Sequence, residues 1–320
     1  MKTMSTLSPT KTRRNLTRVS DLTPIGLVRL LELAEAMKDD SAHYDDALRD
    51  RAIALIFEKP STRTRVSFAA AAARLGATPI ALTPEELQLG RGESIADTAR
   101  SLSGYVDVIV IRTFAQATVD ELAQWATVPV VNALSDEHHP CQALADLLTI
   151  EEEFGDLAGR KLTFVGNGGD NVAHSLLEAG ALAGLDVTIA CPPAYAPDQG
   201  VLDAALRIAE ASGAELQVVH DPRAAVAGAH AVYADVWASM GDEAEHETRR
   251  RALAPYQVTE ELMSLAQPGA IFLHCLPATR GEEMAASVID GPQSAVWRQS
   301  ANRLPTEEAV LMMLTRGADR

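Results

Sequence analysis

Short apolar segments alternate with segments of helical periodicity through almost the whole chain after residue 22. This alternation constrains the fold strongly, because a strand–helix–strand succession favours a parallel sheet whose crossovers each lay a helix over one face. We therefore expect an α/β protein. The expected strands are 52–57, 78–82, 106–111, 128–131, 162–165, 187–190, 216–219, 231–234 and 270–273. The expected helices are 27–37, 66–75, 95–102, 119–125, 142–153, 172–183 and 307–314, the last placed after Pro305 because proline suits a first helical turn.

The pattern pauses between residues 151 and 159 and then restarts, which predicts two units joined there. A length of 320 residues fits two domains of ordinary size. We expect two lobes, 1–150 and 151–304, each a mainly parallel sheet covered by helices, with a small-molecule site in the cleft between them. The C-terminal segment 305–320 is expected to pack back on the first lobe.

The charge balance excludes some functions without naming one. A formal net charge of -16 argues against general binding to nucleic acid or to an anionic membrane. No apolar run reaches the roughly 18–20 residues that cross a bilayer. Cys141, Cys191 and Cys275 form no C-x-x-C pair, which indicates a reducing compartment, and we expect the cytoplasm. Residues 1–20 are basic and are expected to form a solvated tail rather than a transit peptide.

A run of hydroxyl and guanidinium side chains lies between an expected strand and an expected helix. It consists of Ser61, Thr62, Arg63, Thr64 and Arg65. The N–H groups and dipole of a helix N-terminus favour an anion, and arginine binds phosphate oxygens in a fixed fork. The run therefore predicts a phosphate-type site rather than an ordinary N-cap with solvated arginines.

Residues 136–142 allow three interpretations. His138, His139 and Cys141 would be the ligands of a metal site, although adjacent histidines rarely converge on one ion. Alternatively, His139 and Gln142 would direct donors at a carbonyl oxygen from the first turn of a helix. The third interpretation is a solvent-facing pair of histidines at a helix cap.

Three further motifs follow expected strands. Residues 166–171 form a Gly-rich turn that resembles a dinucleotide fingerprint only weakly, because Asn171 stands at the third glycine position and the required acidic residue is missing. Asp235 would face the ligand crevice of a parallel sheet and hold an ammonium group, or merely cap a turn. The sequence His274-Cys275-Leu276-Pro277 offers either a thiolate nucleophile or an inert buried thiol.

Together these segments resemble the aspartate/ornithine carbamoyltransferase superfamily, and its ornithine branch most closely. The resemblance runs from about residue 15 to the C-terminus. It is carried by residues 61–65, by Gln88-Leu89-Gly90 with Glu93-Ser94, by Arg112-Thr113-Phe114, by His139-Pro140-Cys141-Gln142, by Asp235 with Ser239-Met240-Gly241, and by residues 274–277.

The resemblance implies transfer of the carbamoyl group of carbamoyl phosphate to the δ-amine of L-ornithine, with no metal or other cofactor. The first lobe would bind carbamoyl phosphate and the second ornithine. The implied carbamoyl-phosphate residues are Ser61, Thr62, Arg63, Thr64, Arg65, Gln88, Arg112, His139, Gln142, Cys275, Leu276 and Arg303, of which Arg112, His139, Gln142, Cys275 and Arg303 would be catalytic. The implied ornithine residues are Asn171, Asp235, Ser239 and Met240. The family's sites lie at the subunit boundaries of a trimer, so a homotrimer or a multiple of trimers is expected, with Gln88 reaching the neighbouring site.

The sequence departs from the family pattern at four places. Asn167 replaces an acidic residue, Thr279 replaces a histidine, Ala301 replaces a glutamate, and Leu304-Pro305-Thr306 replaces a Leu-His stretch. Three alternatives stay open: transfer to another amine, such as putrescine or an acylated ornithine, a nicotinamide-dependent oxidoreductase built on the Gly-rich turn, and a non-catalytic relative, which Thr279 and Ala301 favour.

Overall fold

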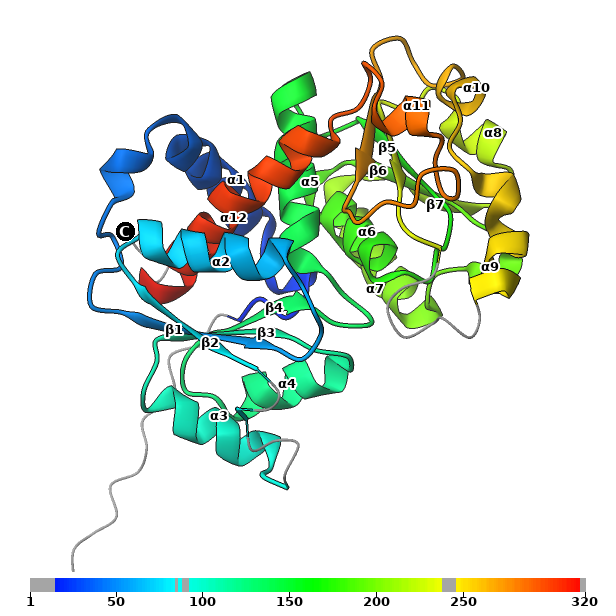
Figure 1. Ribbon diagram of the computed structural model, residues 1–320. Helices are drawn as coiled ribbons and strands as arrows, with labels where there is room; N and C mark the ends of the chain where they lie inside the picture. Colours follow the sequence, from blue (N-terminus) through cyan, green and yellow to red (C-terminus); the bar gives the residue numbers. More distant parts are fainter. Residues whose placement is uncertain (1–14, 84–85, 88–91, 238–245, 317–320) are drawn as a thin grey trace, which may run out of the picture.

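The computed structural model describes residues 15–83, 86–87, 92–237 and 246–316. Two parallel sheets form two lobes, so the expected fold class is confirmed (Figure 1). The first sheet has the order β2-β1-β3-β4, from β1 (Ala52–Phe57), β2 (Thr78–Leu82), β3 (Val108–Arg112) and β4 (Val130–Leu134). The second has the order β7-β6-β5-β8-β9, from β5 (Lys161–Val165), β6 (Asp186–Ala190), β7 (Leu216–Val219), β8 (Ala231–Ala234) and β9 (Ile271–His274).

Helices cover both faces of the first sheet, which explains its almost continuous apolar strands. In β1, Ile53 and Leu55 belong to the core beneath α1 (Pro24–Asp39) and α2 (Arg63–Arg74). Ala54 and Ile56 point to the opposite face and pack with α3 (Ile95–Ser103) and α4 (Gln116–Trp125). The period of two along a strand thus supplies two hydrophobic cores from one segment.

The second sheet is covered in the same way. On one face lie α6 (Asn171–Ala183) and α7 (Gln199–Ser212). Their buried side chains belong to the same hydrophobic core as those of α1 and α2 in the first lobe. The other face packs against α8 (Pro222–Val226), α10 (Glu260–Met263) and α11 (Ala286–Ile289). These three helices, α9 (His246–Leu253) and the 14-residue α7 are all absent from the sequence expectation. Helices of four to eight residues are too short for periodicity to be detected reliably. In α7 the buried positions are Val201, Ala205 and Ala209, and two of these three are small alanines that mark the apolar face only weakly.

Two long helices connect the lobes. They are α5 (Pro140–Phe154) and α12 (Val296–Arg316), and α12 packs on α5, α1 and α2 (Figure 1). The expectation that the last helix begins after Pro305 is wrong, because α12 begins at Val296 and contains Pro305 in its interior. Proline lacks the N–H of one helical hydrogen bond, but the buried polar contacts of the surrounding turns hold the helix together. Within the described residues, no helix is long and apolar enough to cross a membrane.

The strand orders place the predicted motifs together. In each sheet the order reverses at one point, between β1 and β3 in the first lobe and between β5 and β8 in the second. Crevices that bind ligands form outside the carboxyl ends of strands at such points. Residues 58–65 and Arg112 follow the first reversal, whereas the Gly-rich turn and Asp235 follow the second.

Candidate active site

The N-terminus of α2 begins within the predicted hydroxyl and guanidinium run. The Oγ of Ser61 accepts a hydrogen bond from the N–H of Thr64 at 3.3 Å, and Thr62 occupies the N-cap position with no side-chain cap bond. Thr64 is buried, whereas Thr62, Arg63 and Arg65 are exposed. Other N–H groups of the first turn have no helical acceptor, so this terminus can receive an anion.

Three guanidinium groups interact at this terminus. Arg112, at the end of β3, is buried, and its pKa is lowered to about 10 by burial and by repulsion from Arg303 and Arg63. Desolvation and repulsion from Arg303 also lower the pKa of Arg63. Within the described residues, the Nε of Arg112 is buried without a hydrogen-bond partner. Buried cations that repel one another favour binding of an anion between them.

Arg303 is held by several partners at once. Its Nη1 donates to the Oε1 of Gln142 at 2.9 Å, and its Nη2 donates to the Oγ1 of Thr64 at 3.3 Å. The Oε1 of Glu307 accepts from Nε at 3.1 Å and from Nη2 at 2.7 Å. The guanidinium of Arg303 is therefore fixed in orientation before any ligand binds.

His139 faces the same cations from the start of α5. Its side chain is buried, and its pKa is lowered by burial and by repulsion from Arg303, Arg112 and Arg63. The imidazole is therefore neutral near pH 7, and within the described residues its Nδ1 has no hydrogen-bond partner. A neutral imidazole beside three guanidinium groups can donate to a developing oxyanion without adding a further full charge.

The second lobe contributes Asp235 and Cys275. The Sγ of Cys275 donates to the Oδ1 of Asp235 at 2.9 Å, and both side chains interact electrostatically with Arg63. Burial and the nearby carboxylate of Asp235 raise the pKa of Cys275 well above its usual value. The thiol is therefore neutral, which argues against the thiolate-nucleophile interpretation.

The segment after Cys275 is fixed by a buried histidine. Leu276 has a left-handed φ of 58°, and its N–H donates to the Nδ1 of His274 at 2.9 Å. The Nε2 of His274 lies 3.2 Å from the Oε1 of Glu283, which also accepts from the N–H of Thr279 at 2.6 Å. Since Nδ1 accepts, the proton of a neutral His274 is on Nε2 and donates to Glu283.

The Gly-rich turn packs against its own lobe. A Cβ on Gly168 would lie 2.9 Å from Cys191 Sγ, from Ile189 Cγ2 and from the carbonyl oxygen of Tyr195. This close approach explains the glycine without a nucleotide. At the end of the turn, Asn171 donates from Nδ2 to the carbonyl oxygen of Ser135 in the first lobe at 2.6 Å.

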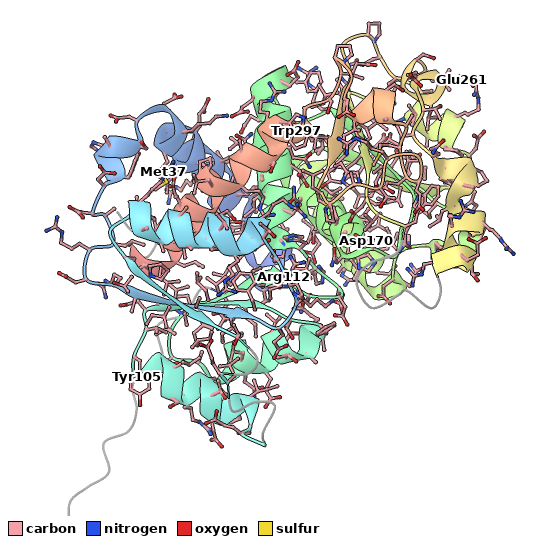
Figure 2. The ribbon with its side chains drawn as sticks, in the orientation of Figure 1. Met37, Tyr105, Arg112, Asp170, Glu261 and Trp297 are labelled. Atoms are coloured by element: carbon pink, nitrogen blue, oxygen red, sulfur yellow. The ribbon has the colours of Figure 1, made fainter. Side chains whose placement is uncertain are left out.

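The carboxylate of Asp170 lies beside that of Asp235. Burial chiefly raises the pKa of Asp235 well above its usual value, and Asp170 adds repulsion and a hydrogen bond. Figure 2 labels Asp170 on the second lobe and Arg112 on the first, on sides that face one another. The site thus has a cationic side and an acidic side, which suits one ligand with a phosphate group and another with an ammonium group.

The described residues contain one group of side chains with metal-ligand spacing, Asp235, His274 and Cys275, whose ligand atoms lie within 4.8 Å of one another. Both ring nitrogens of His274 are already engaged, so a metal would have to displace one of these hydrogen bonds. The predicted alternative of His138, His139 and Cys141 is not such a group. His138 and His139 are both buried, which excludes the solvent-facing pair of histidines as well, and burial lowers the pKa of His138 to about 3.

Some predicted residues are not brought into these contacts. Gln88, Ser239 and Met240 lie outside the described residues, as do residues 1–14 of the basic tail. Arg65 is exposed on α2, two positions from Arg63, and residues at that spacing point to different faces of a helix. Its role in binding stays a prediction.

Sequence reasoning missed three buried residues behind the site, Asp146, Gln299 and Glu307. Each is a polar residue at an interior position of α5 or α12. Their burial depends on how α5 and α12 pack in the folded chain, so no local sequence signal marked them.

Comparisons with known proteins agree with this geometry. Residues 14–152 match the family model described as the aspartate/ornithine carbamoyltransferase carbamoyl-P binding domain. Residues 158–314 match the Asp/Orn binding domain of the same family.

Similar whole proteins span nearly the entire chain. An ornithine carbamoyltransferase of Methanothermobacter thermautotrophicus is 52% identical over 301 residues, covering 94% of this chain and 98% of the relative. One of Acidothermus cellulolyticus is 53% identical over 294 residues, covering 92% of this chain and 94% of the relative. The solved structure of ornithine carbamoyltransferase from Pyrococcus furiosus is 48% identical, with a TM-score of 0.91 over 96% of this chain and 98% of that one.

Proposed function

The chain belongs to the aspartate/ornithine carbamoyltransferase family, and we propose that it transfers the carbamoyl group of carbamoyl phosphate to the δ-amine of L-ornithine. The products are L-citrulline and phosphate. One observation carries the proposal: the guanidinium groups of Arg63, Arg112 and Arg303 meet beside His139, and the acidic pair Asp170 and Asp235 lies across from them.

The phosphate end of carbamoyl phosphate would bind at the N-terminus of α2. Ser61, Thr62 and Thr64 offer hydroxyls and backbone N–H groups, and Arg63 and Arg112 offer charge-assisted donors. The unpartnered Nε of Arg112 supports this assignment, because a phosphate oxygen would satisfy it. Arg65 and Gln88 complete the proposed set.

The carbamoyl end would lie between His139, Gln142 and Arg303. All three side chains can donate to the carbonyl oxygen, where negative charge grows as the amine attacks. The N–H of Leu276 already donates to His274. Leu276 would therefore contact the carbamoyl group through its carbonyl oxygen, which can accept a hydrogen bond from the carbamoyl N–H. Orientation of the planar carbamoyl group supplies the remaining catalytic advantage.

The amino-acid end of ornithine would bind to the second lobe. Asp235 attracts the α-ammonium group, Asn171 donates to the carboxylate, and Ser239 and Met240 complete the proposed set. Cys275, hydrogen-bonded to Asp235, would help to orient the δ-amine.

The reaction needs no covalent intermediate with the protein, because the carbamoyl donor is already activated. The δ-ammonium group must first lose a proton, since only the neutral amine has a lone pair. The amine then attacks the carbonyl carbon, the carbon–oxygen bond to phosphate breaks, and the departing phosphate can accept the second amine proton. Fixed cations stabilise charge first on the carbonyl oxygen and then on the phosphate.

We extend the proposal to the setting of the enzyme. It would act in the cytoplasm, in arginine metabolism, as a homotrimer or a multiple of trimers in which Gln88 reaches the site of a neighbouring subunit.

The test is a product assay with carbamoyl phosphate and a panel of amines. We expect citrulline from ornithine and at least about 100-fold lower kcat/KM with putrescine, which lacks the groups that would pair with Asn171 and Asp235. Preferred carbamoylation of putrescine or of an acylated ornithine would overturn the substrate assignment. Tight binding of a bisubstrate phosphonate with no turnover of any amine would indicate a non-catalytic relative.

A further inference from the structure

A buried carboxylate, Asp146, lies behind the proposed active site on α5. Its Oδ1 accepts hydrogen bonds from the Nε2 of Gln142 at 2.7 Å and from the Nε2 of Gln299 at 2.6 Å. Within the described residues its Oδ2 has no hydrogen-bond partner. The hydroxyl of Tyr233 also interacts with this carboxylate. A buried carboxylate that has only neutral donors and no direct cation is costly to maintain, which calls for an explanation.

The two glutamines extend from Asp146 to opposite sides of the site. The Oε1 of Gln142 accepts from Arg303 at 2.9 Å, and the Oε1 of Gln299 accepts from the backbone N–H of His274 at 2.8 Å. Arg303 and a backbone N–H can only donate, so each glutamine must turn its oxygen toward that donor. Each amide nitrogen then faces Asp146, which in its ionised form can only accept. The hydrogen-bond orientation is therefore forced from both ends.

We propose that Asp146 is a positioning residue, which aligns Gln142 with Arg303 in the carbamoyl pocket and, through Gln299, the start of the Cys275–Leu276 segment. The inference rests on the proposed function, because it assigns Asp146 a part in that same site. Asp146 touches no substrate; it acts through the two glutamines. One carboxylate on α5 thereby connects groups from α12 and from the end of β9.

The positioning depends on ionisation of Asp146, since a carboxylate is the stronger acceptor of amide hydrogen bonds. The titratable groups that face it are Arg303 from α12, Tyr233 from β8 and Cys275 after β9. Burial raises the pKa of Asp146 to about 7, opposed by its hydrogen bonds with Gln299, Gln142 and Tyr233 and by Arg303. Turnover should therefore rise with pH through this region as Asp146 loses its proton.

The decisive variant is Asp146→Asn, compared with the wild-type enzyme in assays of kcat from pH 6 to pH 9. Asparagine keeps one acceptor oxygen and the side-chain shape but cannot ionise. We expect kcat to fall at least about tenfold at pH 8, as when a polar contact that organises the site is weakened. The fall in kcat should be smaller at pH 6, so that the variant's kcat rises less steeply with pH than that of the wild type. A folded variant with the wild-type profile would overturn the inference.

A second variant covers the case in which Asp146→Asn does not fold. Gln299→Met removes one donor that favours the ionised carboxylate, so the ascending limb should move to higher pH. The matched control is Gln293→Met, which changes an exposed glutamine of the same lobe and should leave the limb in place. An unmoved limb in Gln299→Met contradicts the inference alone, whereas a wild-type enzyme that forms no citrulline contradicts the proposed function.

Discussion

The Nη2 of Arg303 donates to the Oγ1 of Thr64 at 3.3 Å, across 239 positions of sequence. The bond joins α12, which begins beside the second lobe, to the first turn of α2, where the phosphate group is proposed to bind. Thr64 thus has two assigned partners, one in the protein and one in the ligand. The carbamoyl and phosphate ends of the site are consequently connected by direct contact.

Replacing Arg63 by alanine should lower kcat by about 100-fold or more, because a preorganised donor to the developing charge is lost. The side chain is exposed, so the thermal midpoint should change little. Steady-state assays with varied carbamoyl phosphate, together with calorimetry, would measure both effects. Arg207→Ala, at an exposed arginine of α7, is the control for loss of one positive charge. Near-normal turnover of a soluble Arg63→Ala protein would remove Arg63 from the proposed site.

The ionisation of Glu308 should make the free energy of unfolding depend on pH. Burial raises its pKa to about 7, its partner Arg74 is 3.8 Å away, and its Oε1 has no hydrogen-bond partner within the described residues. A carboxyl group whose pKa is higher in the folded than in the unfolded state contributes stability below the unfolded pKa and loses it as pH rises through the folded pKa. Glu308→Gln should therefore stabilise the protein at pH 8, by on the order of 1–3 kcal/mol, and have little effect near pH 5.

Thermal midpoints of wild type and Glu308→Gln at pH 5 and pH 8 would test this sign. Glu210→Gln, at an exposed position of α7, provides the control for a general change in net charge. Equal shifts of the midpoint at both pH values would show that Glu308 is not the titrating group.

The positions of most site residues could be predicted because they depend on topology. The 61–65 run and Asp235 each follow a strand, and Arg112 is the last residue of one. Parallel strands that meet at a reversal bring their carboxyl ends together. The departures from the family pattern are also understandable in the fold. Asn167 accepts the N–H of Gly169 at 3.2 Å through its side-chain oxygen, Thr279 uses only its backbone N–H in the contact with Glu283, and Ala301 is exposed.

The course of α12 could not be predicted. Local propensity favours ending a helix before Pro305, but tertiary contacts override it. Asn302, three residues earlier, accepts from Lys38 of α1 at 2.9 Å and donates to Thr149 and Glu152 of α5 at 2.9 and 3.0 Å. These partners are more than 140 positions away in the chain, so no local pattern reveals them. Asp146 was missed for the same reason.

Two neighbouring glycines of the Gly-rich turn should respond differently to substitution. Gly168→Ala would place a methyl group 2.9 Å from three atoms, one of them a backbone oxygen, and should cost about 1–3 kcal/mol while displacing Asn171. In Gly169→Ala the nearest atoms lie at 3.4 and 3.5 Å, so that variant should be tolerated. We expect Gly168→Ala to raise the KM for ornithine more than the KM for carbamoyl phosphate. Equal KM values for ornithine in the two variants would show that this turn does not contribute to ornithine binding.

Cys275→Ser distinguishes a shaping role of the thiol from covalent catalysis. The serine hydroxyl can still donate to the Oδ1 of Asp235, as the thiol does at 2.9 Å. With that contact kept, kcat should fall by no more than about tenfold, in line with the roughly 1 kcal/mol of a single hydrogen bond. Loss of a true nucleophile typically costs up to about 10⁶-fold. A serine variant with turnover reduced to that degree, or a carbamoyl thioester trapped on wild-type Cys275 by rapid quench and mass spectrometry, would show that the neutral thiol is activated during the reaction.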